Sequence, residues 1–317
     1  MSWEYYSNVA FVSSVVVYLA AMVAHTAEWA AARRVSGGLV GELQLAAVGA
    51  PAPAGEGQVR PETDPTVDAR VESFGRIGVA LTMLGFLLSV GGVVLRGLAA
   101  GRLPWGNMFE FTTAAMVLVV GTYLVLLWRA HMRWLGLPVT LLAAVGNGLA
   151  VTVFYVAVAP LVPALHSVWF IIHIVAACVA GAAFNVGGLL SIFFLIKQRA
   201  ERRGQTGGYL SRLPDVRRLD LLAYRFLAFS FPLWTFTVAA GAIWAEYAWG
   251  RYWGWDPKET WALVTWVIYA CYLHARATAG WKGTRAAVIA IIGLASFWFN
   301  FIGINLLVSG LHSYAGI

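Results

Sequence analysis

Residues 249–261 have the sequence Trp249-Gly-Arg-Tyr-Trp253-Gly-Trp255-Asp256-Pro-Lys-Glu259-Thr-Trp261, which lies directly between two long apolar segments. Four tryptophans within thirteen residues are an unusual density for a short connection. Tryptophan is costly to expose and usually lies where an apolar face meets water. The aromatic belt of a membrane protein also contains tryptophans, but it distributes them over many helix ends. The cluster therefore indicates a flat, amphipathic platform at a membrane boundary, which would suit a large planar ligand.

The composition of the chain is that of an integral membrane protein. Of its 317 residues, 60% are hydrophobic and only 12% are charged, whereas a soluble domain has about 25% charged residues. Runs of about 20 apolar residues are long enough to cross a bilayer. The sequence therefore predicts an all-α, polytopic bundle in the lipid bilayer with about eight spans, near residues 9–31, 76–98, 107–128, 136–157, 168–196, 222–246, 259–279 and 285–309. No basic segment precedes the first span, so we expect it to be retained and not cleaved as a signal peptide.

The distribution of basic residues predicts the orientation of this bundle. With the N-terminus outside, eight spans place the C-terminus outside as well. All but four of the 22 Lys and Arg residues then lie on the inner side, and the exceptions are Arg96, Arg102, Arg251 and Lys258. Because basic residues favour the cytoplasmic side, the Trp-rich loop is predicted to face outward from a plasma membrane. The net charge of +7 then reflects orientation, and no nucleic-acid partner is expected.

A single membrane domain is predicted, in two parts. Residues 1–75 are expected to form the first transmembrane helix and a cytoplasmic linker, and residues 76–317 the main membrane domain. The linker contains the Pro/Ala/Gly-rich stretch 50–57, which is typical of a mobile segment. Cys178 and Cys271 both lie within predicted spans and form no C-x-x-C motif, so both are expected to be small apolar packing residues.

Local signals predict where two of the helices begin. Asp256 has the position of an N-cap, followed by Pro257 at the first helical position and Glu259 at the third. The two acids are predicted to cap this helix, and ligand binding is the alternative. The outward connector around Asn107 and Glu110 is either the start of a helix or a functional polar segment.

The histidines are candidate functional residues, because ionisable groups inside a membrane are costly. His173 begins the fifth span from outside and His312 follows the eighth span on the same face, so both can reach a ligand at the Trp-rich loop. His274 lies about seventeen residues into its helix, roughly 25 Å from the loop, and cannot reach it. Two neutral imidazoles on opposite faces of a flat metallomacrocycle form a bis-histidine haem site. A hydrogen-bonded core histidine is the alternative for each, and His25 is expected to pair with Glu28.

These motifs resemble the haem-handling protein family defined by a tryptophan-rich WWD domain. Within it, the likeness is greatest to the CcsA/ResC branch of system II cytochrome c biogenesis, labelled CcsB in some actinobacteria. The likeness covers roughly residues 76–317. The matching segments are 253–266 with its continuation 269–276, then 167–173, 305–314 and 104–110.

The resemblance implies that the protein transports protohaem (haem b) across the membrane and presents it at the WWD loop, about residues 247–261. There the haem would be attached through thioethers to the C-x-x-C-H motif of apocytochrome c, together with a ResB/Ccs1 partner. His173 and His312 would be the external iron ligands, and His274 would match the histidine of an inner haem site that the partner completes. The loop residues expected around the external haem are Trp249, Trp253, Trp255, Asp256 and Trp261. His166 departs from the family, in which we expect glutamine.

Three alternatives remain open at this point. A solute transporter would have paired broken helices and polar midplane residues in two related halves. A b-type haem electron carrier would need paired histidines at matching depths on two spans. The system I proteins CcmC and CcmF also have a WWD domain, although Pro257–Trp261 and His312 favour the CcsA/ResC branch. No catalytic acid or base is predicted, so any enzymatic role would be as part of a haem ligation complex.

Overall fold

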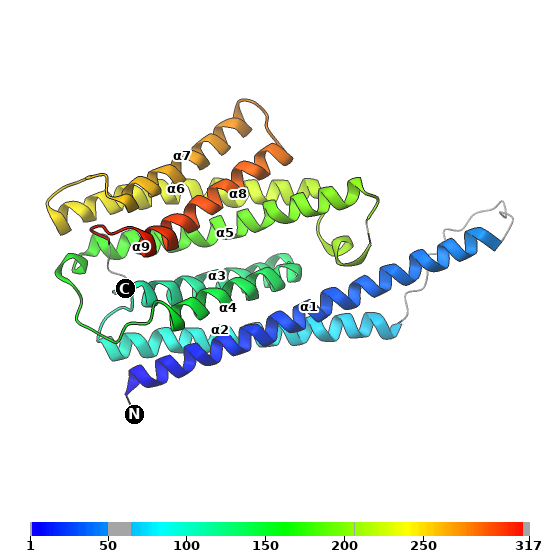
Figure 1. The fold of residues 1–317 in the computed structure, drawn as a ribbon, viewed down its shortest axis with the longest axis horizontal. Helices are drawn as coiled ribbons and strands as arrows, with labels where there is room; N and C mark the ends of the chain where they lie inside the picture. The colour runs from blue at the N-terminus through cyan, green and yellow to red at the C-terminus, as the bar shows by residue number, and fades with distance from the viewer. Residues whose placement is uncertain (1, 50–64, 206, 313–317) are drawn as a thin grey trace.

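The computed structural model describes residues 2–49, 65–205 and 207–312, and this part of the chain is all-helical (Figure 1). A helix is present at each of the eight expected spans. These are α1 (Trp3–Gly49), α2 (Pro65–Ala100), α3 (Met108–Ala130), α4 (Gly136–Thr152), α5 (Val168–Arg202), α6 (Val216–Trp249), α7 (Pro257–Ala277) and α8 (Thr284–Trp298). Within the described residues, seven segments are long and apolar enough to cross a membrane. The remaining helix, α7, is long enough at 21 residues, but it is less apolar than the other seven.

Several helix boundaries differ from the predicted ones. The inward linker expected over residues 35–75 is shorter, because α1 continues to Gly49 and α2 begins at Pro65. Its Pro/Ala/Gly-rich stretch lies outside the described residues. The fourth helix ends at Thr152 and not at residue 157, and an irregular segment with Pro160 and Pro163 follows.

The eighth predicted span is also interrupted. After Trp298 the chain forms η4, a π-helical turn from Phe299 to Gly303, before the short helix α9 (Ile304–Leu307). Three short 3₁₀ helices complete the fold: η1 (Arg133–Leu135), η2 (Pro163–Leu165) and η3 (Gly208–Arg212).

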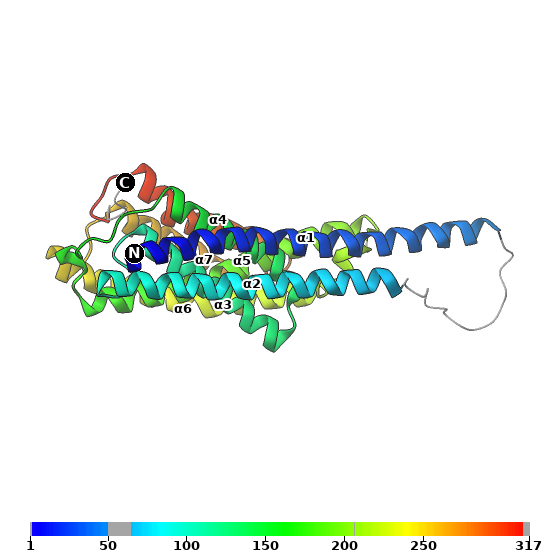
Figure 2. The same ribbon diagram turned by 90° about the horizontal axis from the view of Figure 1, so that it is seen from below.

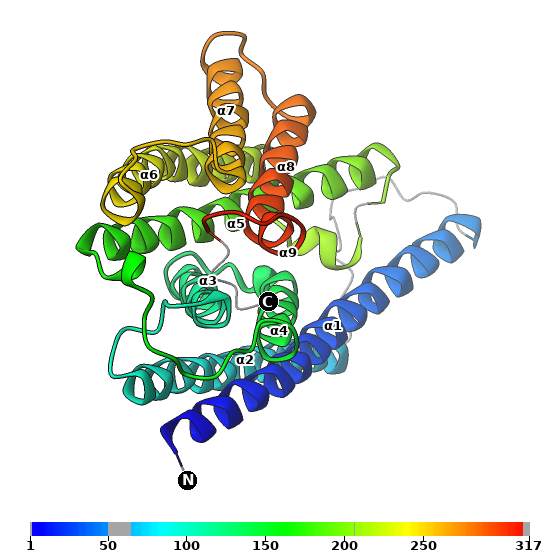
Figure 3. The same cartoon turned by 60° about the vertical axis from the view of Figure 1, so that its left-hand side comes forward.

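The helices form two groups, with α1–α4 on one side and α5–α8 on the other (Figure 3). An apolar cluster containing Val120 of α3, Val139 of α4 and Val186 of α5 joins the two groups. Helix α5 is the most enclosed, with 72% of its most apolar window buried, against 33% in α6 and in α8. It therefore forms the centre of the bundle, and its first turns carry His173.

The connections expected to hold the site lie at one end of the bundle. Figure 1 places the N-terminus, the α6–α7 loop and α9 together, and the α5–α6 and α7–α8 connections at the opposite end. This alternation agrees with the predicted threading. Which side of the membrane each end faces remains a prediction.

Helices α1 and α2 pack antiparallel along their length (Figure 2). Side chains of α1 lie against glycines of α2 at a spacing of seven residues, in the pairs Phe11–Gly92, Tyr18–Gly85 and His25–Gly78. Small residues allow helices in a membrane to approach closely. The buried ring of Tyr18 occupies the space that a side chain at Gly85 would need, since a Cβ atom there would lie 2.7 Å from it.

The expected pairing of His25 is confirmed. Its Nδ1 atom lies 3.3 Å from the Glu28 carboxylate, and both side chains are buried. Arg133 donates to the other oxygen of Glu28 at 3.0 Å. Of the cysteines, Cys178 is buried as expected, whereas Cys271 is exposed on α7.

We predict that Gly85→Ala destabilises the α1–α2 pair and that Gly91→Ala does not. The added methyl at residue 85 would push into Tyr18, and overpacking costs about 1–3 kcal/mol, whereas nothing lies within 4 Å of a Cβ atom at residue 91. Both changes gain similarly in helix propensity, which makes the second a matched control. Thermal unfolding in detergent measures the difference, and equal midpoints would contradict this account of the packing.

Candidate functional site

A cavity lies among α5, α6, the start of α7, η4 and the segment after α9. Its walls are mainly apolar and include Trp105, Trp234, Trp244 and Trp253. His173 and His312 both line it. A concave, mainly apolar space with a few convergent polar groups is typical of a small-molecule or cofactor site.

His173 is held on the cavity wall by α6. Its ring stacks on Trp244 with centroids 5.8 Å apart and an interplanar angle of 21°. Its Nδ1 atom lies 2.9 Å from the carbonyl oxygen of Thr237. A carbonyl oxygen only accepts, so Nδ1 carries the proton and Nε2 keeps a free lone pair. Gly241 permits this close approach, because a Cβ atom there would lie 2.8 Å from Nδ1 of His173.

His312 is held by the α6–α7 loop. Its Nδ1 atom lies 2.9 Å from Oδ1 of Asp256, and the backbone amide of Leu311 donates to Oδ2 at 2.8 Å. Burial alone would raise the pKa of Asp256, but the hydrogen bonds and charge of His312 and the two backbone amides lower it to about 2. The acid is therefore ionised at neutral pH and accepts the Nδ1 proton, which again leaves Nε2 as the free nitrogen.

The two imidazoles share the same arrangement although they come from distant parts of the chain. Both ring centroids lie within 6 Å of that of Trp244, at 5.8 Å and 5.5 Å. Each Nδ1 donates to a fixed oxygen, and among the described residues neither Nε2 atom has a hydrogen-bond partner. Metal-binding histidines are commonly oriented in this way by an oxygen on the second nitrogen. Their assignment as iron ligands remains a prediction.

The predicted helix cap at Asp256 is confirmed. Asp256 accepts from the backbone amide of Lys258 at 3.1 Å, and Glu259 accepts from the amide of Asp256 at 3.1 Å, which together form a capping box. Glu259 also accepts from the amide of Gly254 and from Arg251. Asp256 thus has two roles, since the same carboxylate caps α7 and holds His312.

The loop tryptophans do not form the single flat platform expected from the sequence. Trp253 lines the cavity, whereas Trp255 is 67% exposed and its ring is turned 89° from that of Trp253. Trp249 packs on His312 at 4.9 Å, and Trp261 packs on Phe299 at 4.3 Å. The left-handed backbone of Trp255, with φ of 58°, turns the loop between the rings and separates them.

Two tryptophans of α6 that line the cavity were not predicted from the sequence. Trp234 and Trp244 of α6 line it with Thr237 and Gly241 between them. These four positions recur at helical spacing on one face of a helix that leads directly into the Trp-rich loop. This periodicity is the sequence signal that could have identified these residues. Trp105, in the connector before α3, also lines the cavity and packs against the cluster that contains Trp244.

The remaining histidines lie away from this cavity. His274 is exposed near the C-terminal end of α7 and does not line the cavity, which agrees with the expected distance from the loop. His166 is exposed, and its Nε2 atom lies 3.3 Å from the carbonyl oxygen of Leu161. Its proximity to His173 in sequence does not place it at the site.

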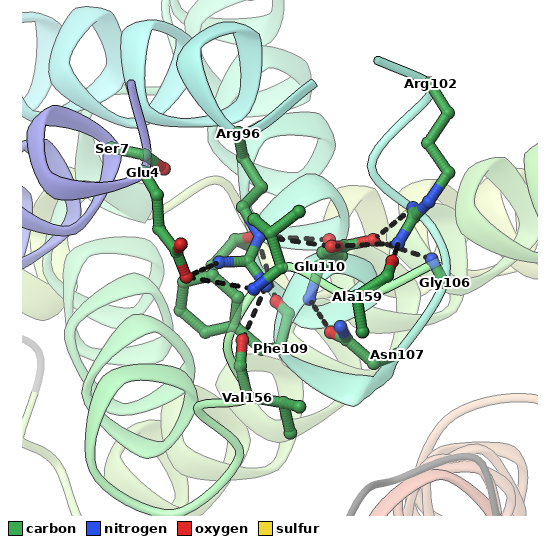
Figure 4. A network of polar contacts seen from close by, with 12 residues as sticks. Glu4, Ser7, Arg96, Arg102, Gly106, Asn107, Phe109, Glu110, Val156 and Ala159 are labelled. Atoms are coloured by element: carbon green, nitrogen blue, oxygen red, sulfur yellow. Dashed lines mark hydrogen bonds and ion pairs between the residues drawn. The ribbon is translucent and has the colours of Figure 1, made fainter. Parts of the chain in front are cut away.

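A buried ionic network holds the connector that forms one cavity wall (Figure 4). Asn107 caps α3 by accepting from the amide of Glu110, which confirms a helix start at this point. The fully buried Glu110 accepts from Arg96 at 3.1 Å, from Arg102 at 2.8 Å and from the Gly106 amide at 2.7 Å. Arg96 also bonds Glu4 of α1 at 3.2 Å. The network therefore connects α1, α2 and α3 to the residues beside Trp105.

Comparison with known proteins adds the following findings. Residues 105–312 match the model of the cytochrome C assembly protein family. The chain is 35% identical over 272 residues to the cytochrome c biogenesis protein CcsA of Chlamydomonas reinhardtii, which covers 82% of this chain and 76% of the relative. It is also 35% identical over 297 residues to the CcsA of a Picosynechococcus strain, covering 76% of this chain and 87% of the relative.

A solved structure shows the same fold. All of this chain superimposes on part of the cytochrome c heme lyase CcmF with a TM-score of 0.64 and 15% sequence identity. The chain spans about half of that protein, since the match covers 49% of it.

We predict that Glu110→Gln strongly destabilises the protein. The change leaves the largely buried Arg102 without a counter-charge and leaves the buried Arg96 with Glu4 alone, and breaking a buried ion pair on one side costs about 3–5 kcal/mol. The control is Arg76→Gln, which removes a pair with an arginine side chain that is 77% exposed and should cost less than about 1 kcal/mol. Chemical denaturation in detergent measures both, and similar costs would show that the network does not hold the connector.

Proposed function

This chain belongs to the CcsA family of cytochrome c assembly proteins, and on that premise we propose that it moves haem across the membrane and presents it in the aromatic cavity. Apocytochrome c would receive the haem there. The main supporting observation is the pair of imidazoles with free Nε2 atoms. His173 and His312 line one cavity, and each is fixed through Nδ1 by an oxygen acceptor.

The residues of the cavity fit haem as a substrate. Neutral imidazole nitrogens are iron ligands, and apolar walls suit the porphyrin ring. Trp244 lies against both histidines, and Trp234 and Trp253 extend the aromatic wall. The setting of His312 also suits ligand exchange, because this residue lies outside the regular helices and a single side chain, that of Asp256, holds its Nδ1 atom.

The attachment reaction needs little acid–base chemistry from this chain. Each cysteine thiol of a C-x-x-C-H motif adds across one haem vinyl group. The S–H bond and the vinyl π bond are replaced by a C–S and a C–H bond, without net oxidation. The gain from the protein is proximity and orientation, and the histidine of the motif can replace His173 or His312 on the iron. The chain would thus act as one component of a cytochrome c synthetase.

A second membrane protein of the ResB/Ccs1 type is proposed as the partner. His274 is exposed on α7, near the end of the helix opposite the WWD loop. An imidazole on a lipid-facing helix surface is costly unless a partner group meets it. An inner haem site between His274 and the partner would load haem from the cytoplasmic side of the plasma membrane, and the cavity with His173 would face the extracytoplasmic side.

We predict that His173→Ala and His312→Ala each abolish holocytochrome c formation and remove the bis-histidine absorption of the reduced, haem-loaded protein. Each change removes one Nε2 ligand while the aromatic wall remains. The assay is cytochrome c maturation in a host without its own system, combined with spectra of the purified protein. His166→Ala is the control and should mature cytochrome c normally, because its ring lies outside the cavity. Normal maturation by both cavity variants would refute the ligand assignment, and a colourless wild-type protein would favour a solute transporter.

We predict that His274→Ala blocks haem delivery from the cytoplasm and leaves the cavity intact. With the partner coexpressed, the variant should purify with much less haem than wild type. Haem added to the purified variant should still give the bis-histidine spectrum, since residue 274 does not line the cavity. Unimpaired maturation in cells would contradict an inner site at this residue.

A further inference from the structure

Lys258 is the polar residue of the cavity that haem binding through iron does not explain. It lies in the first turn of α7, and its side chain lines the cavity together with His173 and His312. With the described residues, its ammonium group makes no hydrogen bond and no ion pair within 4 Å.

The neighbouring acids are already engaged. Asp256 accepts from His312 and from the Leu311 amide, and Glu259 accepts from Arg251 and from two backbone amides. The carboxylate of Asp256 does not contact the amine of Lys258. Lys258 therefore brings a basic group to the cavity without a direct counter-ion among the described residues.

The other basic residues predicted on this side of the membrane are all paired. Arg96 and Arg102 bond to Glu110, and Arg251 bonds to Glu259. The lack of a direct counter-ion is thus specific to Lys258 in the cavity and is not a general property of the basic residues at this end of the bundle. An unpaired ammonium in an apolar space is costly, and an anionic ligand group would remove the cost.

A second polar group on the wall also lacks a partner. The side-chain oxygen of Asn300 is buried, and the described residues offer it no hydrogen bond. Asn300 belongs to the π-helical turn η4 and lines the cavity. Such π-helical turns often occur at functional sites. Unsatisfied polar groups on a mainly apolar wall indicate a ligand with an apolar body and a polar edge.

We propose that Lys258 is the carboxylate-binding residue of this cavity and that it pairs with a propionate of the haem. The inference rests on the proposed function, because it takes the ligand to be a porphyrin dicarboxylate. The two propionates occupy one edge of the macrocycle and the vinyl groups lie away from that edge. A propionate held at the start of α7 therefore turns the vinyl groups away from α7, toward the rest of the cavity mouth. Lys258 would set which edge of the haem meets the thiols.

The test compares haem with haem dimethyl ester, in which both carboxylates are neutral. Binding of each to the purified full-length chain is measured by spectral titration for wild type, Lys258→Met and Lys258→Gln. The wild type should prefer the free acid by about 10- to 100-fold, as expected for a charge-assisted hydrogen bond. Both variants should lose this preference and bind the ester about as well as wild type does. The control is Lys282→Met, an exposed lysine in the α7–α8 connection, which should keep the wild-type preference.

The outcomes separate this inference from the proposed function. The preference is the ratio of the affinities for haem and for its dimethyl ester, measured on one protein sample. A partial loss of folded protein affects both titrations equally and leaves this ratio unchanged. If both variants retain the wild-type preference, Lys258 does not bind the carboxylate, although the haem site stands. If wild type binds both porphyrins equally through a bis-histidine spectrum, the inference again fails alone. If wild type binds neither porphyrin, the proposed function fails as well.

Discussion

The carboxylate of Asp256 joins two parts of the site that are far apart in the chain, the start of α7 and the segment after α9. It caps the first turn of α7, and it accepts from the amide of Leu311 and from Nδ1 of His312. One charged group therefore fixes where α7 begins and where the segment after α9 returns to the bundle. Because a carboxylate only accepts, it also decides which imidazole nitrogen of His312 is free.

A related constraint operates on another part of the cavity wall. Polar groups buried near a membrane must be satisfied internally, and the connector before α3 meets this requirement through Glu110. That side chain receives two guanidinium groups and a backbone amide. Its arginine partners come from α2 and from the turn after it, and Arg96 extends the network to α1. The α1–α2 pair thus supports a cavity wall, although its own residues do not line the cavity.

Small residues determine how close the helices come at the site and away from it. Gly241 lets His173 lie against α6, and the glycines of α2 accept the aromatic rings of α1. These contacts leave His173 with a fixed Nδ1 acceptor and the cavity with rigid aromatic walls. A rigid wall would suit the function proposed above, in which the cavity orients a planar substrate, because the cost of ordering the site would then be met during folding.

The sequence alone determined the membrane class, the position of each long helix, the cap at Asp256 and the pairing of His25 with Glu28, because these follow from composition, hydrophobic runs and short-range signals. It also singled out His173 and His312, which lie on one cavity. Only the tertiary structure decided that Trp244 lies against both imidazoles, that Trp255 turns outward and that Lys258 has no direct counter-ion within the described residues. Those features depend on contacts between residues far apart in the chain and on the close approach of α5 to α6. Neither periodicity nor spacing along one segment encodes them, so they could not be predicted from local patterns.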